Sequence, residues 1–274
     1  MKIVKYQIKV PYIKNNTETA YTATLTSYTL DIFNETGRRK SPAVIISPGG
    51  GYYKVAEKEA EPVAVRFAAH GIQAFVLDYS VGKVPFPIAL LELSKAVAFV
   101  RENAFEWDID PENISICGFS AGGHLTASLG VHWNSDLVKN TLSLTDEHKP
   151  NSMILCYPVI TSGEYTHEGS IINISDDEGC FSDMFSLENH VSKDTPRTFI
   201  WHCADDDVVP VENTLFFAKA LSKNKINFEA HIYPFGGHGL SLCDETTSYT
   251  LQEHNEKCSE WFIKAVNWIK EPNK

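Results

Sequence analysis

The sequence lacks an apolar run long enough to cross a bilayer, which argues against a membrane-spanning protein. No stretch of 18 residues is continuously apolar in the 274-residue chain. The opening stretch, MKIVKYQIKVPYIKNN, alternates apolar and polar residues and lacks the apolar core and small-residue cleavage site of a signal peptide. We therefore expect a soluble, cytoplasmic protein without a membrane partner.

An excess of positive charge is also lacking. The chain has 24 Lys and Arg against 35 Asp and Glu, which gives a formal net charge of −11. Nucleic-acid phosphates and anionic lipids attract basic surfaces, so we expect neither as a partner. A neutral small molecule suits this charge better, and the sequence leaves a homo-oligomer open.

The six cysteines include no C-x-x-C pair. Cys117, Cys156 and Cys203 each lie in an apolar, strand-like run, so we expect buried free thiols rather than disulfides or a cysteine-type zinc site. The sequence predicts no metal and no cofactor.

From residue 43 onward, strand patterns alternate with helix patterns. The first strand, AVIIS, is a continuous apolar run between prolines, which is typical of a strand buried on both faces. The predicted strands are 43–47, 72–79, 113–117, 152–158, 197–203 and 227–234, and the predicted helices are 59–71, 88–106, 123–130, 213–225 and 246–269. This order predicts an α/β fold with a doubly wound, mostly parallel sheet and helices on both faces.

Two segments fall outside this alternation. Residues 2–10 and 20–33 are rich in Thr, Tyr, Ile and Val and predict an antiparallel opening pair. The 38 residues of 159–196 have little periodicity and are too long for a plain connection, so we expect a small cap or active-site loop there. Its acidic run, Asp176-Asp177-Glu178, would discourage anionic substrates. No linker or repeat is visible, which predicts one domain over 1–274.

The most informative motif is Gly118-Phe119-Ser120-Ala121-Gly122, which lies between a predicted strand and a predicted helix. This is G-x-S-x-G in the setting of a nucleophile elbow, where two glycines allow a tight turn that presents the serine. Ser120 is therefore a candidate nucleophile. A glycine-rich helix entry with a capping serine would give the same letters.

A serine needs a base, and the base needs a carboxylate to orient it. In parallel sheets such groups gather at the carboxyl ends of the strands. Three further strand ends carry suitable residues, namely Gly49-Gly50-Gly51, Asp205-Asp206-Asp207 and Gly236-Gly237-His238-Gly239. Helix capping, a surface turn or a phosphate loop could each explain one of them, but the phosphate-loop continuations are missing.

The glycine run predicts the oxyanion site. We expect backbone N–H groups of Ala121 and of Gly50 or Gly51 to bind the oxyanion, because glycine allows substrate and backbone to approach closely.

At this point the chain resembles the bacterial acetyl-esterase and acetylxylan-esterase branch of the α/β-hydrolases, which is related to hormone-sensitive-lipase-like esterases and shares features with the prolyl-oligopeptidase group. The matching segments are SPGGGY (47–52), FVLDYS (75–80), GFSAGGHL (118–125), TPRTFIWHCADDDVVPVENTLFFAKAL (195–221) and YPFGGHGLSL (233–242). The resemblance implies that Ser120 is the nucleophile, Asp206 the acid and His238 the base. SPGGG stands where lipase-like members have H-G-G-G, so that motif's histidine is absent.

Three other histidines, His70, His124 and His202, are interpreted as packing or capping residues. Aromatic residues beside the strand ends are expected to form the substrate walls; these are Tyr52, Tyr53, Phe86 and Phe235.

The resulting hypothesis is a serine esterase that removes short acyl groups, chiefly acetyl, from sugars or oligosaccharides through an acyl-enzyme. A peptidase or a general carboxylesterase could use the same triad. A metal-dependent deacetylase would use Asp205, Asp206, Asp207 and histidines as ligands, but consecutive aspartates at a strand end point in different directions and no H-x-x-H or H-x-x-E pattern supports them. A binding protein that kept the scaffold without the chemistry is the non-enzymatic alternative.

Overall fold

The computed structural model describes residues 1–14, 17–31, 40–176, 179–250 and 254–271. Its strands form one sheet in the order β1-β2-β4-β3-β5-β6-β7-β8. They are β1 (Lys2–Lys14), β2 (Thr17–Thr29), β3 (Ser41–Ser47), β4 (Gln73–Asp78), β5 (Ile109–Phe119), β6 (Ser152–Cys156), β7 (Arg197–Cys203) and β8 (Phe228–Tyr233). The helices are α1 (Glu61–Ala69), α2 (Ile88–Glu102), α3 (Ala121–His132), α4 (Asp136–Leu142), α5 (Glu168–Ile174), α6 (Glu212–Lys223) and α7 (Glu256–Lys270).

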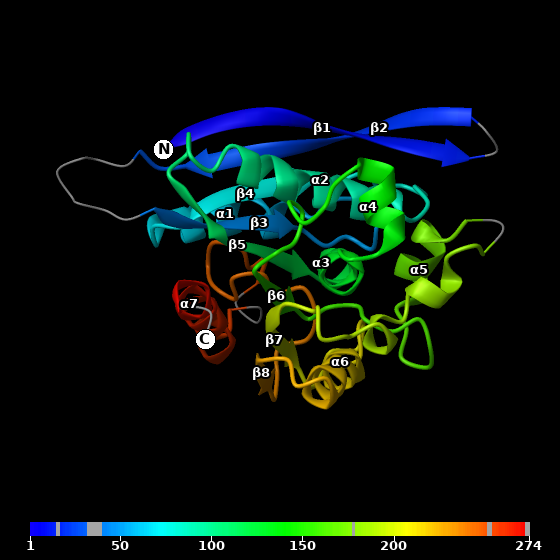
Figure 1. The fold of residues 1–274 in the computed structure, drawn as a ribbon. Helices are drawn as coiled ribbons and strands as arrows, with labels where there is room; N and C mark the ends of the chain where they lie inside the picture. The colour runs from blue at the N-terminus through cyan, green and yellow to red at the C-terminus, as the bar shows by residue number, and fades with distance from the viewer. Residues whose placement is uncertain (15–16, 32–39, 177–178, 251–253, 272–274) are drawn as a thin grey trace.

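The predicted mixture of strand directions is confirmed. β1 pairs with β2 antiparallel, and β2 pairs with β4 antiparallel, whereas every pair from β4 through β8 is parallel. The hairpin of β1 and β2 forms one margin of the sheet (Figure 1). Because the parallel strands run the same way, their carboxyl ends meet at one edge, where the candidate site lies.

The central strands are buried on both faces, as their continuous apolar runs predict. Val44, Ile45 and Ile46 of β3 are all fully buried, and Ile46 stands in register with Cys117 of β5. Cys117, Cys156 and Cys203 are buried free thiols, in agreement with the prediction. Burial on both faces requires a layer of helices on each side of the sheet.

Two apolar clusters show these layers. One cluster joins residues of α2, α3 and α6 to the sheet, and the other joins residues of α1 and α7. The apolar side of α7, which includes Trp261, Phe262, Ala265 and Trp268, is buried as predicted. The doubly wound arrangement is therefore confirmed (Figure 1).

The prediction that the last helix starts at 246 was wrong. The Asp244 carboxylate accepts a hydrogen bond from the Thr246 N–H at 3.0 Å, which favours a turn over a helix at this point. α7 starts only after Asn255, whose side chain caps it by accepting from the Cys258 N–H at 3.0 Å.

The segment 159–196 contains α5 and two short 3₁₀ turns, η3 (Ser182–Met184) and η4 (Leu187–Asn189). The Asn173 side chain of α5 donates to the Gly51 carbonyl oxygen at 2.9 Å, which fastens this segment to the loop after β3. Within the predicted acidic run, Asp177 and Glu178 lie outside the described residues.

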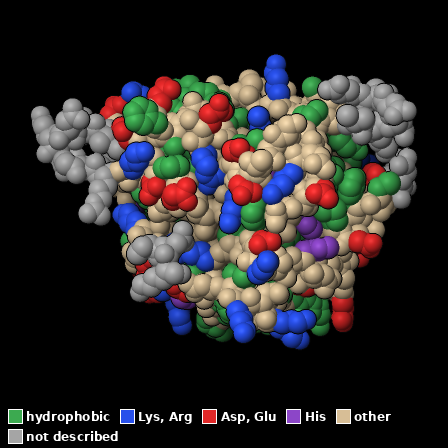
Figure 2. Space-filling view, viewed as in Figure 1, with side chains coloured by type: hydrophobic (Ala, Val, Ile, Leu, Met, Phe, Trp, Pro, Cys, Tyr) green, Lys and Arg blue, Asp and Glu red, His purple; other side chains and the backbone are tan. Residues whose placement is uncertain are grey.

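Acidic and basic side chains are interspersed on the face of the molecule seen in Figure 2. Within the described ranges, no helix has the length and apolar character needed to cross a membrane.

Candidate active site

Ser120 lies at a sharp turn between β5 and α3. Its backbone has φ 53° and ψ −118°, a conformation that costs energy for a residue with a side chain. The Ser120 N–H donates to the Cys156 carbonyl oxygen on the neighbouring strand at 3.0 Å, which helps to hold the turn. The residue is 8% exposed, so its hydroxyl is reached only through the site.

The two motif glycines are required by sterics at this turn. A Cβ atom at Gly118 would collide with the Gly122 carbonyl oxygen, and a Cβ at Gly122 would collide with the carbonyl oxygens of Ser47 and Pro48. Strand β5, helix α3 and the end of β3 therefore approach each other more closely than any side chain would allow. This is the local geometry of a nucleophile elbow.

The loop after β8 brings His238 to the serine. Its Nε2 lies 2.8 Å from Ser120 Oγ, and its Nδ1 lies 2.7 Å from Asp206 Oδ2. The Asp206 carboxylate can only accept, so Nδ1 carries the proton and Nε2 can accept from the serine hydroxyl. The structure thus brings Ser120, Asp206 and His238 together in the tautomer that a general base requires.

Both oxygens of the Asp206 carboxylate have hydrogen-bond partners. Oδ1 accepts from the N–H groups of Val208 and Val209 at 3.0 and 2.9 Å, while Oδ2 contacts His202 and His238. Burial alone would raise the pKa of Asp206, but the hydrogen bonds from His202 and His238 outweigh it and hold this pKa well below its usual range. The group stays ionised at neutral pH.

His202, which the sequence predicts as a packing or capping residue, also contacts the Asp206 carboxylate. It is fully buried, and its Nε2 lies 2.8 Å from the Val209 carbonyl oxygen and 3.1 Å from Asp206 Oδ2. Both partners are acceptors, so Nε2 carries the proton, and Nδ1 accepts from Thr214 Oγ1 at 2.8 Å. The four-residue spacing from His202 to Asp206 was the available signal.

The neighbouring aspartates have other environments. Asp205 Oδ1 accepts from the Gly237 N–H at 2.9 Å, which ties the loop of Asp206 to the loop of His238, and Asp207 is exposed. In the described part of the chain, no group of three His, Cys, Asp or Glu side chains is arranged to hold a metal ion.

The loop after β3 lies against the elbow. Gly50 and Gly51 both have positive φ, 118° and 66°, which glycine adopts without strain. The Gly49 N–H donates to Glu59 Oε2 at 2.7 Å, whereas the N–H groups of Gly50, Gly51 and Ala121 donate to no other described residue. These three backbone N–H groups therefore have no acceptor among the described residues, and Gly49, which precedes two of them, lies against Ser120.

Glu59 lies behind this loop and was not anticipated from the sequence, where it is one acid in a polar stretch. It is only 3% exposed, and Oε1 accepts from the Tyr157 hydroxyl at 2.7 Å. Burial raises the pKa of Glu59, while the hydrogen bonds from Tyr157 and Gly49 act against that rise. The Tyr157 ring meets the His238 ring edge to face, with centroids 5.1 Å apart.

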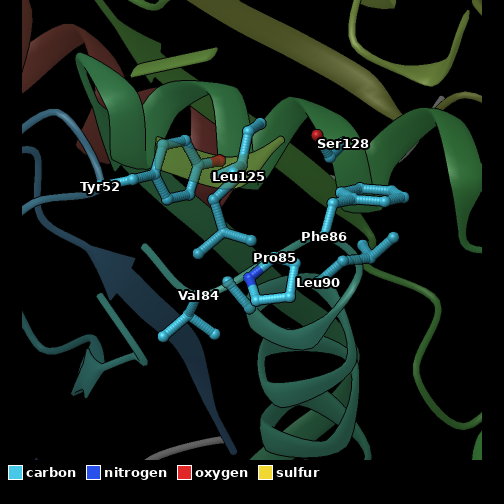
Figure 3. Close-up of a pocket in the computed structure, with 9 residues that line it drawn as sticks. Tyr52, Val84, Pro85, Phe86, Leu90, Leu125 and Ser128 are labelled. Atoms are coloured by element: carbon cyan, nitrogen blue, oxygen red, sulfur yellow. The ribbon is translucent and has the colours of Figure 1, made fainter. Parts of the chain in front are cut away.

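The four aromatic residues expected at the substrate walls fall into two groups. Tyr52 and Phe86 are buried at 4% and 6% exposure and line a cavity of about 10 Å³, room for one water molecule, together with Val84, Pro85, Ala89, Leu90, Leu125, Ser128 and Ile174 (Figure 3). Tyr53 and Phe235 are each 71% exposed. Only the second pair can offer a ring face to an approaching ligand without rearrangement.

His167 is a further histidine at this edge of the sheet, besides His202 and His238. It precedes α5, and its Cε1 lies 3.9 Å from where a Cβ at Gly51 would stand. Its Nδ1 accepts from the Ser170 N–H at 3.2 Å, so Nε2 carries the proton of the neutral ring. Burial, and then the nearby His238, lower the pKa of His167 and favour that neutral form.

Comparison with known proteins gives consistent matches. The BD-FAE family matches residues 30–221. An endo-1,4-beta-xylanase B of Butyrivibrio fibrisolvens is 41% identical over 75% of this chain and 33% of its own, and an acetylxylan esterase of Xylanibacter ruminicola is 33% identical over 76% and 42%. The chain thus spans less than half the length of these relatives.

Among solved structures, an acetyl ester-xyloside bifunctional hydrolase from Caldicellulosiruptor lactoaceticus superposes with a TM-score of 0.74 at 38% identity, covering 89% of each chain.

Proposed function

The chain belongs to the BD-FAE family and has the α/β-hydrolase fold, and on that premise we propose that it is a serine esterase that removes short acyl groups, chiefly acetyl, from sugars or oligosaccharides. The observation that carries the proposal is the hydrogen-bonded chain from Ser120 through His238 to Asp206, next to unused backbone N–H groups. One domain over 1–274 would hold the whole site, since all strands of the described chain share one sheet.

In the first half-reaction, Ser120 Oγ attacks the ester carbonyl carbon while His238 Nε2 takes the hydroxyl proton. The carbonyl oxygen becomes an oxyanion, which the N–H groups of Ala121 and of Gly50 or Gly51 stabilise. When the tetrahedral intermediate collapses, the bond to the alcohol oxygen breaks and His238 returns its proton to that oxygen. The alcohol leaves, and the acyl group remains on Ser120.

In the second half-reaction, water takes the place of the alcohol. His238 removes a proton from the water, which attacks the acyl-enzyme carbonyl carbon, and the released Ser120 oxygen recovers the proton. Asp206 remains ionised throughout and stabilises the imidazolium that forms in each half.

Several features support a neutral sugar ester as substrate. The relatives named above include an acetylxylan esterase and an acetyl ester-xyloside hydrolase. The exposed rings of Tyr53 and Phe235 suit stacking on a sugar face, and His167 Nε2–H, which donates to no other described residue, suits a sugar hydroxyl. Tyr52 and Phe86 would limit the depth of the acyl site, because the cavity that they line has no room for a long acyl chain.

The test is a comparison of purified protein on two substrate sets. The first set is p-nitrophenyl esters from acetate to octanoate, and the second is acetylated xylo-oligosaccharides, with Ser120→Ala as the blank. We expect kcat/KM to fall as the acyl chain lengthens and acetate to be released from the oligosaccharides. A steady rise toward octanoate, or cleavage of peptides but not of acetylated sugars, would favour a general carboxylesterase or a peptidase on the same triad.

A further inference from the structure

A buried carboxylate, that of Glu59, is hydrogen-bonded to the glycine loop, and the mechanism above does not use it. We propose that Glu59 is a positioning residue. It joins the oxyanion loop, Gly49-Gly50-Gly51, to the loop of the base, which contains His238 and Ser241, and it places a second negative charge near His238. The inference rests on the proposed function, because it assumes that Ser120 and His238 react as described. It concerns how their surroundings are held in place.

The first connection runs from Glu59 to the oxyanion loop. Glu59 Oε2 accepts from the Gly49 N–H at 2.7 Å, immediately before the two glycines whose N–H groups are free to bind an oxyanion. A Cβ at Gly49 would stand 2.7 Å from Glu59 Oε2 and 3.0 Å from Ser120 Cβ, so carboxylate, loop and elbow are in direct contact. The bond to Gly49 fixes the peptide that leads into Gly50.

The second connection runs from Glu59 to the loop of the base. The Ser241 N–H donates to the Tyr157 hydroxyl oxygen at 2.8 Å, so that hydroxyl directs its own proton to Glu59 Oε1 at 2.7 Å. Ser241 Oγ also donates to the Lys58 carbonyl oxygen at 2.7 Å, next to Glu59 in the chain. Ser241 follows His238 by three residues, so these bonds hold the segment that presents the imidazole.

A neutral amide could not replace this carboxylate without loss. Both oxygens of Glu59 accept from neutral donors, whereas a glutamine offers one acceptor and would turn an N–H group toward one of the two donors. Burying an ionised group is costly, so a purely structural bridge would be served better by other residue types. A carboxylate at this place gains its advantage when His238 becomes positively charged during the reaction.

The charged and titratable groups around the pair are few and identifiable. Around Glu59 they are His238, Lys58, Tyr79, Cys156 and Tyr157. Around His238 they are Asp206, Glu59, His167 and Tyr157. Asp206 and Glu59 are the carboxylates in these two sets, while the exposed Asp205 accepts from the N–H of the neighbouring Gly237. Removing the Glu59 charge therefore leaves the imidazolium with Asp206 as its buried negative partner.

The deciding variant is Glu59→Gln, and the matched control is Glu57→Gln, which removes the same charge from the exposed side of the same 3₁₀ turn, η2 (Glu57–Glu59). The measurements are the pH profiles of p-nitrophenyl acetate hydrolysis and of Ser120 labelling by a fluorophosphonate, neither of which needs a carbohydrate. We expect Glu59→Gln to lower kcat/KM about tenfold or more, as misplaced groups do, and to move the acidic limb of both profiles to lower pH. Glu57→Gln should match the wild type.

Tyr157→Phe tests the hydrogen-bonded connection from Glu59 to Ser241 separately from the negative charge of Glu59. The variant keeps the ring beside His238 and the Glu59 carboxylate but removes the hydroxyl. It should slow both reactions while leaving the acidic limb near its wild-type position. A Glu59→Gln protein with wild-type rates would overturn the proposal. A Glu59→Gln protein that unfolds at a lower temperature, but whose pH profile keeps the wild-type acidic limb, would also overturn it. A wild type that is labelled at Ser120 but does not cleave acetylated sugars would refute the proposed substrate and leave the Glu59 result standing.

Discussion

His202 Nε2 lies 3.1 Å from Asp206 Oδ2, the same carboxylate oxygen that His238 contacts at 2.7 Å. One oxygen of the acid therefore serves two imidazoles, and only one of these reaches the serine. The buried His202 is held in turn by Thr214 and Val209, so it restrains the carboxylate. Asp206 is therefore held in position by His202 and its partners as well as by its place in the loop.

From this geometry we expect only one of the three consecutive aspartates to be essential. Asp206→Asn should lower kcat about 10⁴-fold, because the amide favours the wrong tautomer of the base. Asp205→Asn and Asp207→Asn should retain activity within about tenfold, since Asp205 accepts from the Gly237 N–H of the loop and Asp207 is exposed. Steady-state kinetics on p-nitrophenyl acetate measures all three. Equal losses across the series would instead indicate a shared structural or metal-binding role, which a chelator would then test.

The second prediction concerns the nucleophile. Ser120→Ala should lower kcat by about 10⁴ to 10⁶ while the thermal unfolding temperature stays close to that of the wild type. The Ser120 side chain contributes one hydrogen bond, to His238, and the turn itself is held by backbone contacts. A fluorophosphonate should label the wild type at Ser120, as located by peptide mass. Label on another serine, or an active alanine variant, would refute the triad.

The tight turn at Ser120 and the alternation of strands with helices were predictable because they depend on local patterns. Gly118 and Gly122 mark a close approach of backbones, and apolar runs such as 43–47 mark strands buried on both faces. The functional surroundings were not predictable in the same way. Glu59 meets Tyr157, which is 98 residues away, and no sequence pattern reveals that pairing. His202 lies four residues before Asp206, but this spacing alone does not show that the two side chains meet.

The third prediction concerns stability against pH. Burial lowers the pKa of both His124 and His132 to about 4, from an ordinary value of 6.5. The unfolded chain therefore takes up protons below pH 6.5 that the folded chain takes up only near pH 4, so stability falls as pH falls across this window. Each histidine contributes at most about 3 kcal/mol to the loss. Urea unfolding at pH 7, 6, 5 and 4 measures it.

Glu92 changes the dependence of stability on pH in the opposite direction to the two histidines. Burial raises the pKa of this carboxyl to about 7, so the unfolded chain ionises first as pH rises from 4.5, and stability falls toward pH 7. For this reason the test compares variants. His132→Gln should flatten the acid-side decline relative to the wild type, whereas the exposed His254→Gln should leave it unchanged. A slope that His132→Gln does not alter would contradict the assignment.

The last prediction tests the carbohydrate substrate through residues at the rim of the site. Tyr53→Ala, Phe235→Ala and His167→Ala should each lower kcat/KM for acetylated xylo-oligosaccharides about tenfold, because each removes a contact that only the sugar can make. Their activity on p-nitrophenyl acetate should stay near that of the wild type, since the acyl group and the triad are unaffected. Kinetics with both substrates on the same protein preparations gives the comparison.

The matched control is Phe105→Ala, which removes an aromatic ring that is 86% exposed just before β5, at the edge of the sheet opposite the site. Its kcat/KM should match that of the wild type on both substrates, because loss of an exposed ring by itself does not alter catalysis. If the rim variants lose activity equally on both substrates, Tyr53, Phe235 and His167 support the triad or the acyl group and do not contact the sugar. The serine-esterase proposal would survive that result, but its assignment to carbohydrate esters would lose its structural support in this chain and would rest on the relatives alone.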